Sequence, residues 1–155
     1  MKRLIVATAI AFFLMGSSAG AQAPDAGDSQ GFFQHLRISI EHYLGRPYVW
    51  GASGLKSFDC SGFLWRIMSD NGILLKRTTA RKLYMMLPPA SKADQGKFGT
   101  LVFFDNLKHV GMIDNAEFFY HAQVSVGTNH SQMNPFWRQK VYGYRRLPIV
   151  SPAVN

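Results

Sequence analysis

The spacing of apolar residues changes at Pro88-Pro89, and this change limits the folds that the chain can adopt. Before it, apolar residues recur three and four positions apart, which predicts helices over 30–44, 60–69 and 78–86, after an irregular lead-in over 24–29. After it, short runs rich in aromatic and aliphatic residues predict strands over 100–104, 109–113, 117–124 and 141–147. Helices followed by strands predict an α+β fold, with N-terminal helices packed on a C-terminal antiparallel sheet.

The first 23 residues have the layout of a secretory signal peptide. A basic Lys2-Arg3 pair precedes an apolar run of 12 residues, Leu4–Met15, and Ala21-Gln22-Ala23 provides a small-residue cleavage site. A membrane-spanning helix needs about 20 apolar residues, so this run is too short for an anchor. We therefore predict a signal peptide over 1–23 and a single exported domain over 24–155, located in the periplasm or secreted, without a membrane span after cleavage.

The charge balance points to an anionic partner but not to nucleic acid. The chain has 17 Lys and Arg against 9 Asp and Glu, a formal net charge of +8. The basic residues are scattered rather than clustered, and export removes most nucleic-acid partners. A non-catalytic protein that binds an anionic polymer through its positive charge is one hypothesis for the function. Nothing in the sequence indicates an oligomer, and we expect a monomer.

The single cysteine, Cys60, is the first candidate for chemistry. In an exported protein, a cysteine without a partner is buried and inert, intermolecular, or reactive. Asp59 is a suitable N-cap for the helix over 60–69, so the thiol lies at a helix N-terminus, which is expected to lower its pKa. The same backbone N–H groups would stabilise an oxyanion, and the small residues Ser61 and Gly62 are expected to leave room for a ligand.

Two of the five histidines lie on neighbouring predicted strands. If Asp114-Asn115-Ala116 forms the turn, His109 and His121 stand directly opposite each other on one face of the sheet. A register error of one residue would separate them onto opposite faces. With Cys60 they would form a nucleophile, a base and an orienting group. The remaining histidines are expected to be ordinary surface residues, namely His35, His42 and His130.

A zinc site is the competing interpretation of one cysteine and several histidines. No closely spaced pair of ligands, such as HxxxH or CxxC, is present. We therefore expect neither a metal nor a cofactor.

Several segments resemble the NlpC/P60 family of papain-like cysteine peptidases, in the order and with gaps compatible with that family. The resemblance covers about Leu36 to Arg146 and is strongest to small periplasmic single-domain members of Gram-negative bacteria. It rests on Tyr48-Val49-Trp50-Gly51, Phe58-Asp59-Cys60-Ser61-Gly62, Arg77-Thr78-Thr79, Leu101-Val102-Phe103-Phe104, His109-Val110-Gly111-Met112 and Phe119-Tyr120-His121-Ala122.

The resemblance implies a peptidoglycan hydrolase that cuts stem peptides, usually between D-γ-glutamyl and meso-diaminopimelate. It implies that Cys60 attacks the carbonyl and that His109 deprotonates the thiol and later protonates the leaving amine. His121 would orient His109, and the Cys60 N–H with the Tyr48 hydroxyl would hold the oxyanion. A related papain-like amidase and a toxin-type wall hydrolase are alternatives within the enzyme class.

The resemblance also implies residues that contact the substrate. Asp59, Ser61 and Arg77 match positions that in some members recognise the free amine and the glutamyl part of the stem, and Trp50 is suited to the groove. Three departures concern the loops around the site and not the nucleophile, base or orienting group. They are Gly51-Ala52 for the usual Gly-Gly, Phe98-Gly99-Thr100 for the usual Pro-Gly-Asp, and Lys76 for the usual Pro before the arginine.

Overall fold

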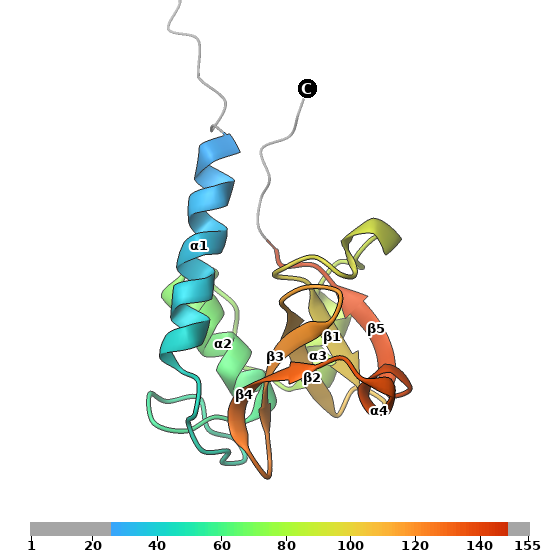
Figure 1. The fold of residues 1–155 in the computed structure, drawn as a ribbon. Helices are drawn as coiled ribbons and strands as arrows, with labels where there is room; N and C mark the ends of the chain where they lie inside the picture. Colours follow the sequence, from blue (N-terminus) through green and yellow to red (C-terminus); the bar gives the residue numbers. More distant parts are fainter. Residues whose placement is uncertain (1–25, 149–155) are drawn as a thin grey trace, which may run out of the picture.

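The computed structural model describes residues 26–148, which form helices packed against one antiparallel sheet (Figure 1). The sheet has five strands in the order β4-β3-β2-β1-β5. This arrangement confirms the predicted α+β class. The elements along the chain are α1 (Ala26–His42), α2 (Cys60–Asp70), α3 (Ala80–Met86), the 3-10 helix η1 (Lys92–Asp94), β1 (Leu101–Phe104), β2 (His109–Ile113), β3 (Phe118–Gln123), β4 (Gly127–Gln132), α4 (Pro135–Arg138) and β5 (Val141–Arg145).

Two expectations about the chain's elements were wrong, and one lies outside the described residues. Helix α1 begins at Ala26, inside the segment expected to be an irregular lead-in. Strand β4 and helix α4 were not predicted, because β4 consists of Gly127-Thr128-Asn129-His130-Ser131-Gln132 and has no apolar alternation. The predicted signal peptide over 1–23 lies outside the described residues. Within 26–148, no helix is both long enough and apolar enough to cross a membrane.

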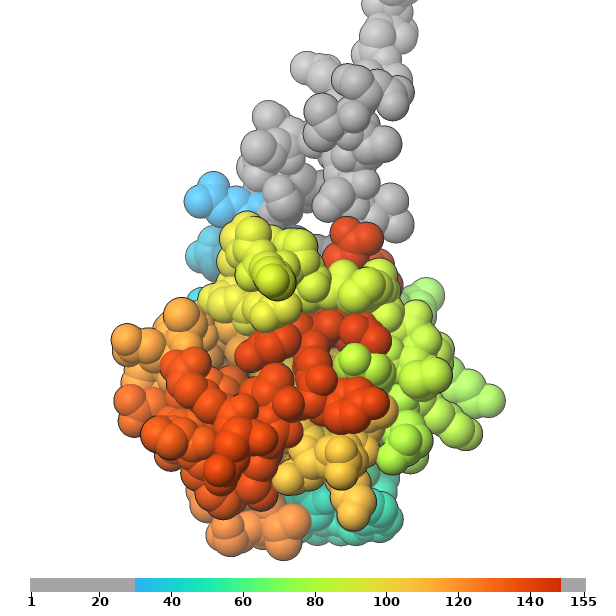
Figure 2. Space-filling view, turned by 90° about the vertical axis from the view of Figure 1, so that its right-hand side faces the viewer, coloured from blue at the N-terminus to red at the C-terminus, as the bar shows by residue number. Residues whose placement is uncertain are grey.

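The sheet separates two clusters of buried side chains. One face packs against the helices, and alternate residues such as Phe103 and Val110 join Leu36 of α1 and Phe63 of α2 in the larger core. The other face carries a smaller cluster that includes Phe104 and Phe119 and is covered by α4. In the space-filling view, β5 and α4, coloured orange to red, occupy the middle of one side, next to green residues of α3 (Figure 2).

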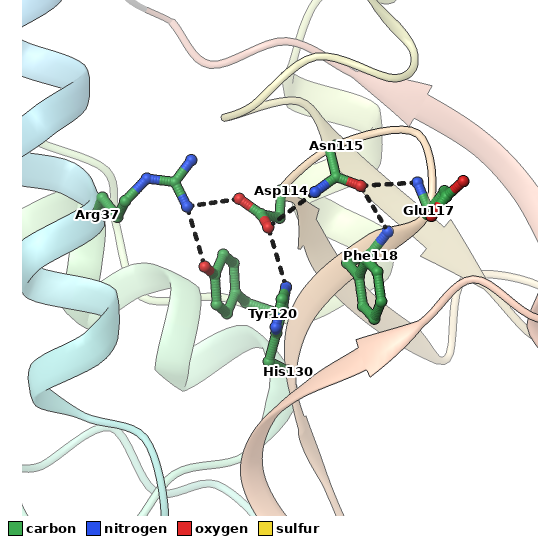
Figure 3. Close-up of polar contacts among 7 residues, drawn as sticks. All are labelled: Arg37, Asp114, Asn115, Glu117, Phe118, Tyr120 and His130. Atoms are coloured by element: carbon green, nitrogen blue, oxygen red, sulfur yellow. Dashed lines mark hydrogen bonds and ion pairs between the residues drawn. The ribbon is translucent and has the colours of Figure 1, made fainter.

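A polar cluster joins helix α1 to the β2–β3 turn and to strands β3 and β4 (Figure 3). Arg37 of α1 donates to Asp114 at 2.5 Å and to the Tyr120 hydroxyl at 3.1 Å. His130 of β4 contacts the second carboxylate oxygen of Asp114 at 3.1 Å and stacks on the Tyr120 ring. His130 is exposed, as are His35 and His42, which confirms the expectation that all three are surface residues. The cluster fixes the β2–β3 turn and therefore the strands that carry the other two histidines.

Candidate active site

Helix α2 begins at Cys60 because Asp59 caps it. The Asp59 carboxylate accepts hydrogen bonds from the Gly62 amide at 2.6 Å and from the Ser61 hydroxyl at 3.0 Å through one oxygen. The other oxygen accepts from the Gly51 amide at 2.9 Å and pairs with Arg77 at 2.6 Å. The structure thus brings three predicted substrate-binding residues together, but it bonds them to one another. Asp59 acts here as an N-cap and as an anchor for the loop at Gly51.

Arg77 completes this network from the segment before α3. Its guanidinium donates to the Ser61 hydroxyl at 2.9 Å as well as to Asp59. Ser61 lines the hollow beside Cys60, but the space next to Gly62 is filled by the chain itself. A side chain at Gly62 would overlap the Ala52 carbonyl oxygen and contact Arg77, so the missing side chain allows the 52–53 loop to pack on the helix.

The Cys60 thiol is buried, with 6% of the residue exposed. Its Sγ lies 4.0 Å from the Lys108 carbonyl oxygen. Burial, and next the neighbouring Asp59 carboxylate, raise the pKa of the thiol to about 11, although the amides of Val110, Ser61 and Cys60 itself act in the opposite direction. The helix N-terminus therefore acts on the thiol pKa in the expected direction, but it does not lower the net pKa in the free protein. Desolvation of the thiolate outweighs the favourable backbone N–H groups.

The two strand histidines form a hydrogen-bonded pair. His109 Nε2 and His121 Nδ1 are 2.8 Å apart, and the rings meet edge to face. The predicted register is wrong by two residues, because His121 stands opposite Gly111 and not opposite His109. A shift of two keeps both side chains on one face of the sheet, so the predicted juxtaposition is confirmed. Gly111 has no side chain to separate the two rings.

Both imidazoles lie in an aromatic environment on the sheet face that α4 covers. His109 stacks on Trp137 with ring centroids 5.6 Å apart, and His121 packs against Phe119 at 4.6 Å. Burial lowers the pKa of His109 to about 4, and burial together with the neighbouring His109 lowers the pKa of His121 to about 3. Both rings are therefore neutral near pH 7.

The thiol lies against the backbone at the start of β2. His109 is the first residue of this strand, and the thiol contacts the backbone of its neighbours Lys108 and Val110. Among the described residues, no hydrogen bond joins the Cys60 sulfur to the His109 ring. Catalytic hydrogen bonds often tighten only when substrate binds, so the free protein need not show this contact.

Tyr48 and Trp50 connect the two sides of an open groove over this site. One hollow is lined by Cys60 and Arg77, the other by His109, and both share Tyr48, Trp50 and Lys108. Trp50 is 84% exposed, as a groove residue should be. Burial, followed by the nearby Cys60 and Asp59 charges, raises the pKa of Tyr48 to about 12, so its hydroxyl stays protonated and can donate.

Sequence reasoning missed three residues around the histidine pair. His121 Nε2 lies 2.9 Å from the Ser131 hydroxyl, which in turn donates to Asn129 Oδ1 at 2.6 Å. Trp137 of α4 stacks over His109. Asn129 and Ser131 belong to the unpredicted strand β4. The only sequence signal for them was that two polar residues two positions apart would share one face of a strand. Within 26–148, no group of three or more His, Cys, Asp or Glu residues is arranged to hold a metal ion.

The depressed histidine pKa values predict that the protein loses stability in mild acid. In the unfolded chain a histidine binds a proton as the pH falls through about 6.5, whereas folded His109 and His121 do so only near 4 and 3. This contribution to stability is therefore fully present above pH 6.5 and is lost between pH 6.5 and about 3. We expect the melting temperature to fall by roughly 5 to 15 °C across this interval.

Calorimetry at a series of pH values measures this decline. The matched control is the His109→Gln/His121→Gln double variant, which lacks both titrating rings and should show a clearly flatter curve over the same interval. Equal slopes for the two proteins would contradict the assignment of the acid loss to these histidines.

A thiol at a helix N-terminus beside a neutral, oriented imidazole is the type of constellation that cysteine peptidases use. Comparison with known proteins gives the family. The NlpC/P60 family profile matches residues 45–146, and the chain belongs to this family. A probable endopeptidase NlpC of Escherichia coli K12 is 31% identical over 138 residues, covering 82% of this chain and 87% of that protein. A probable endopeptidase p60 of Listeria grayi is 32% identical over 125 residues, covering 77% of this chain.

The chain spans only 24% of the Listeria grayi protein and similarly small parts of other p60 relatives. Among solved structures, an NLP/P60 family protein similar to lipoprotein from Staphylococcus aureus aligns with a TM-score of 0.66 at 28% identity, covering 76% of this chain and 41% of that one. The peptidoglycan hydrolase RipB of Mycobacterium tuberculosis aligns with a TM-score of 0.66 at 19% identity, covering 86% and 73%. The second likeness concerns the fold alone.

Proposed function

We propose that the protein is an exported cysteine endopeptidase that hydrolyses peptidoglycan stem peptides at the bond from D-γ-glutamyl to meso-diaminopimelate. The observation that carries this proposal is the position of the Cys60 thiol at the start of α2, against the backbone on either side of His109, in a groove that contains both residues. Relatives named endopeptidase, and one named peptidoglycan endopeptidase, support the reaction class.

The first half of the reaction forms a thioester. His109 takes the thiol proton as Sγ attacks the carbonyl carbon, so an S–C bond forms and the carbonyl oxygen becomes an oxyanion. The Cys60 N–H and the Tyr48 hydroxyl stabilise that oxyanion. The C–N bond then breaks, and the proton on His109 passes to the leaving amine. Because the free thiol and imidazole are both neutral, proton transfer accompanies the attack.

The second half hydrolyses the thioester. His109 deprotonates a water molecule, the hydroxide adds to the acyl carbon, and the C–S bond breaks as the thiolate recovers a proton. His121 holds the His109 ring through the Nε2–Nδ1 hydrogen bond, which turns the opposite nitrogen of His109 toward the groove. The acyl part of the substrate thus lies on the Cys60 side of the groove and the leaving amine on the His109 side.

The charge of the groove suits a substrate rich in carboxylates. Its walls include Arg77, Arg81, Lys82 and Lys108 on the thiol side. Asp59 is the acidic residue on that side, and it is already paired with Arg77. A stem peptide carries free carboxylates on its glutamyl and diaminopimelyl residues and therefore matches this excess of positive charge.

A synthetic stem tetrapeptide tests the proposed bond. We expect the protein to cleave L-Ala-γ-D-Glu-meso-diaminopimelate-D-Ala after the γ-glutamyl residue, which liquid chromatography with mass spectrometry identifies from the two fragments. The control is the isomer linked through the α-carboxyl of D-Glu, which should be cut at least about a hundredfold more slowly because its scissile carbonyl is displaced from the thiol. Cleavage at another bond, or salt-sensitive binding without cleavage, would overturn the proposal; the second result would favour a non-catalytic wall-binding protein.

A further inference from the structure

The histidine pair is the end of a longer chain of hydrogen bonds that reaches into β4. His109 Nε2 contacts His121 Nδ1 at 2.8 Å, and His121 Nε2 contacts the Ser131 hydroxyl at 2.9 Å. Ser131 then donates to Asn129 Oδ1 at 2.6 Å, and Asn129 Nδ2 donates to the Gly127 carbonyl at 2.8 Å. The backbone carbonyl at the far end can only accept a hydrogen bond, so the direction of every hydrogen bond in the chain follows from it.

The donor and acceptor in each link can be assigned in turn. The Gly127 carbonyl requires the NH₂ group of Asn129 on its side, which places the Asn129 carbonyl oxygen toward Ser131. The hydroxyl proton of Ser131 is therefore used on Asn129, and Ser131 can only accept from His121 Nε2. His121 is then protonated on Nε2, which leaves its Nδ1 as an acceptor.

The last link determines the state of His109. Because His121 Nδ1 accepts, the shared proton belongs to His109 Nε2. A neutral imidazole carries one proton, so His109 Nδ1 is left with a free lone pair. Among the described residues this nitrogen has no hydrogen-bond partner, and it is the nitrogen that a thiol base requires. The opposite tautomer would carry a proton on Nδ1 and could not accept one from Cys60.

We propose that Ser131 and Asn129 are positioning residues that fix the tautomer of His109 through His121. This inference rests on the proposed function for its catalytic consequence, but the proton arrangement itself does not depend on the substrate. His121 is 0% exposed, so water cannot replace Ser131 as the hydrogen-bond partner of Nε2. Asn129 also acts to raise the pKa of His121, against the effect of burial, which is the effect of a hydrogen-bond acceptor near a ring N–H.

Ser131→Ala and Ser131→Thr form a matched pair for the test. Alanine removes the acceptor at His121 Nε2, whereas threonine retains the hydroxyl and suits a strand. Nitrogen NMR of the ¹⁵N-labelled histidines reports the protonated nitrogen directly. We expect wild type and Ser131→Thr to show His109 protonated on Nε2 and unprotonated on Nδ1. Ser131→Ala should show a mixture of tautomers, with kcat on the stem peptide about tenfold lower and KM unchanged.

Asn129→Ala extends the test, because it frees the Ser131 hydroxyl to donate to His121 Nε2 and so favours the opposite tautomer. We expect it to show more Nδ1-protonated His109 than Ser131→Ala does. Wild-type His109 protonated on Nδ1, or Ser131→Ala with unchanged tautomers and kcat, would overturn the inference. The NMR measurement needs no substrate, so its result stands even if the stem peptide is not cleaved and the proposed function fails.

Discussion

Cys60→Ala is expected to abolish cleavage of the stem peptide, with a loss in kcat of at least about 10⁴-fold. Without Sγ there is no group at the start of α2 that can form the thioester. The side chain is small and buried in the main core, so its truncation should change the free energy of unfolding by no more than about 1 kcal/mol. Peptide cleavage followed by chromatography, with a thermal melt of the same sample, separates loss of chemistry from loss of fold.

Cys60→Ser is the companion variant, since it retains the size of the side chain and a hydroxyl. Burial already raises the pKa of the thiol to about 11, and a hydroxyl is far harder to deprotonate in the same place. We therefore expect Cys60→Ser to be nearly as inactive as Cys60→Ala. Substantial turnover by either variant would mean that another group carries the reaction. The stem peptide should still bind to both variants, because its contacts along the groove remain.

Asp59→Ala is expected to have the largest effect on stability, about 3 kcal/mol of the free energy of unfolding. The side chain caps α2, anchors the Gly51 amide and pairs with Arg77. Its removal leaves these donors without their acceptor, including a guanidinium whose side chain is only 26% exposed. The start of α2 would then loosen, and with it the position of Cys60, so peptide cleavage should fall as well.

Two controls separate the contributions of Asp59. Asp59→Asn keeps an oxygen for the Gly62 amide but loses the charge opposite Arg77, and we expect about half the destabilisation of Asp59→Ala. Thr79→Ala removes the N-cap of α3, where the Thr79 hydroxyl accepts an exposed and longer hydrogen bond, 3.4 Å, from the Lys82 amide. We expect this variant to lower the free energy of unfolding by no more than about 1 kcal/mol. Urea denaturation measures all three, and equal small losses would contradict the structural role of the Asp59 network.

Much of the fold follows from local patterns, and the exceptions have physical causes. The apolar period predicted three helices and four of the strands, and Asp59 was recognised as a cap. Strand β4 was missed because its pairing with β3 depends on backbone hydrogen bonds rather than on an apolar face. The register between β2 and β3 differed from the prediction because Asn115 accepts from the Glu117 and Phe118 amides and lengthens the turn.

The sequence predicted that Cys60, His109 and His121 lie near one another, but it did not predict the electrostatics of the candidate site. This prediction rested on the single cysteine, on its position at the start of a helix, and on the pairing of the two strands that carry His109 and His121. The raised pKa of the thiol depends on how completely the folded chain excludes water, which no local pattern reports. For the same reason, the sequence did not show that Asp59, Ser61 and Arg77 satisfy one another's hydrogen bonds in the free protein. Their contacts with substrate remain a prediction.

Digestion of purified peptidoglycan sacculi by wild type and Cys60→Ala, with mass spectrometry of the released fragments, tests the central claim most directly. We predict that wild type releases fragments ending in a D-glutamate with a free γ-carboxylate, together with fragments that begin with a free diaminopimelate amine, and that Cys60→Ala releases neither. Release of the same fragments by the folded Cys60→Ala variant, or no release by wild type, would contradict it.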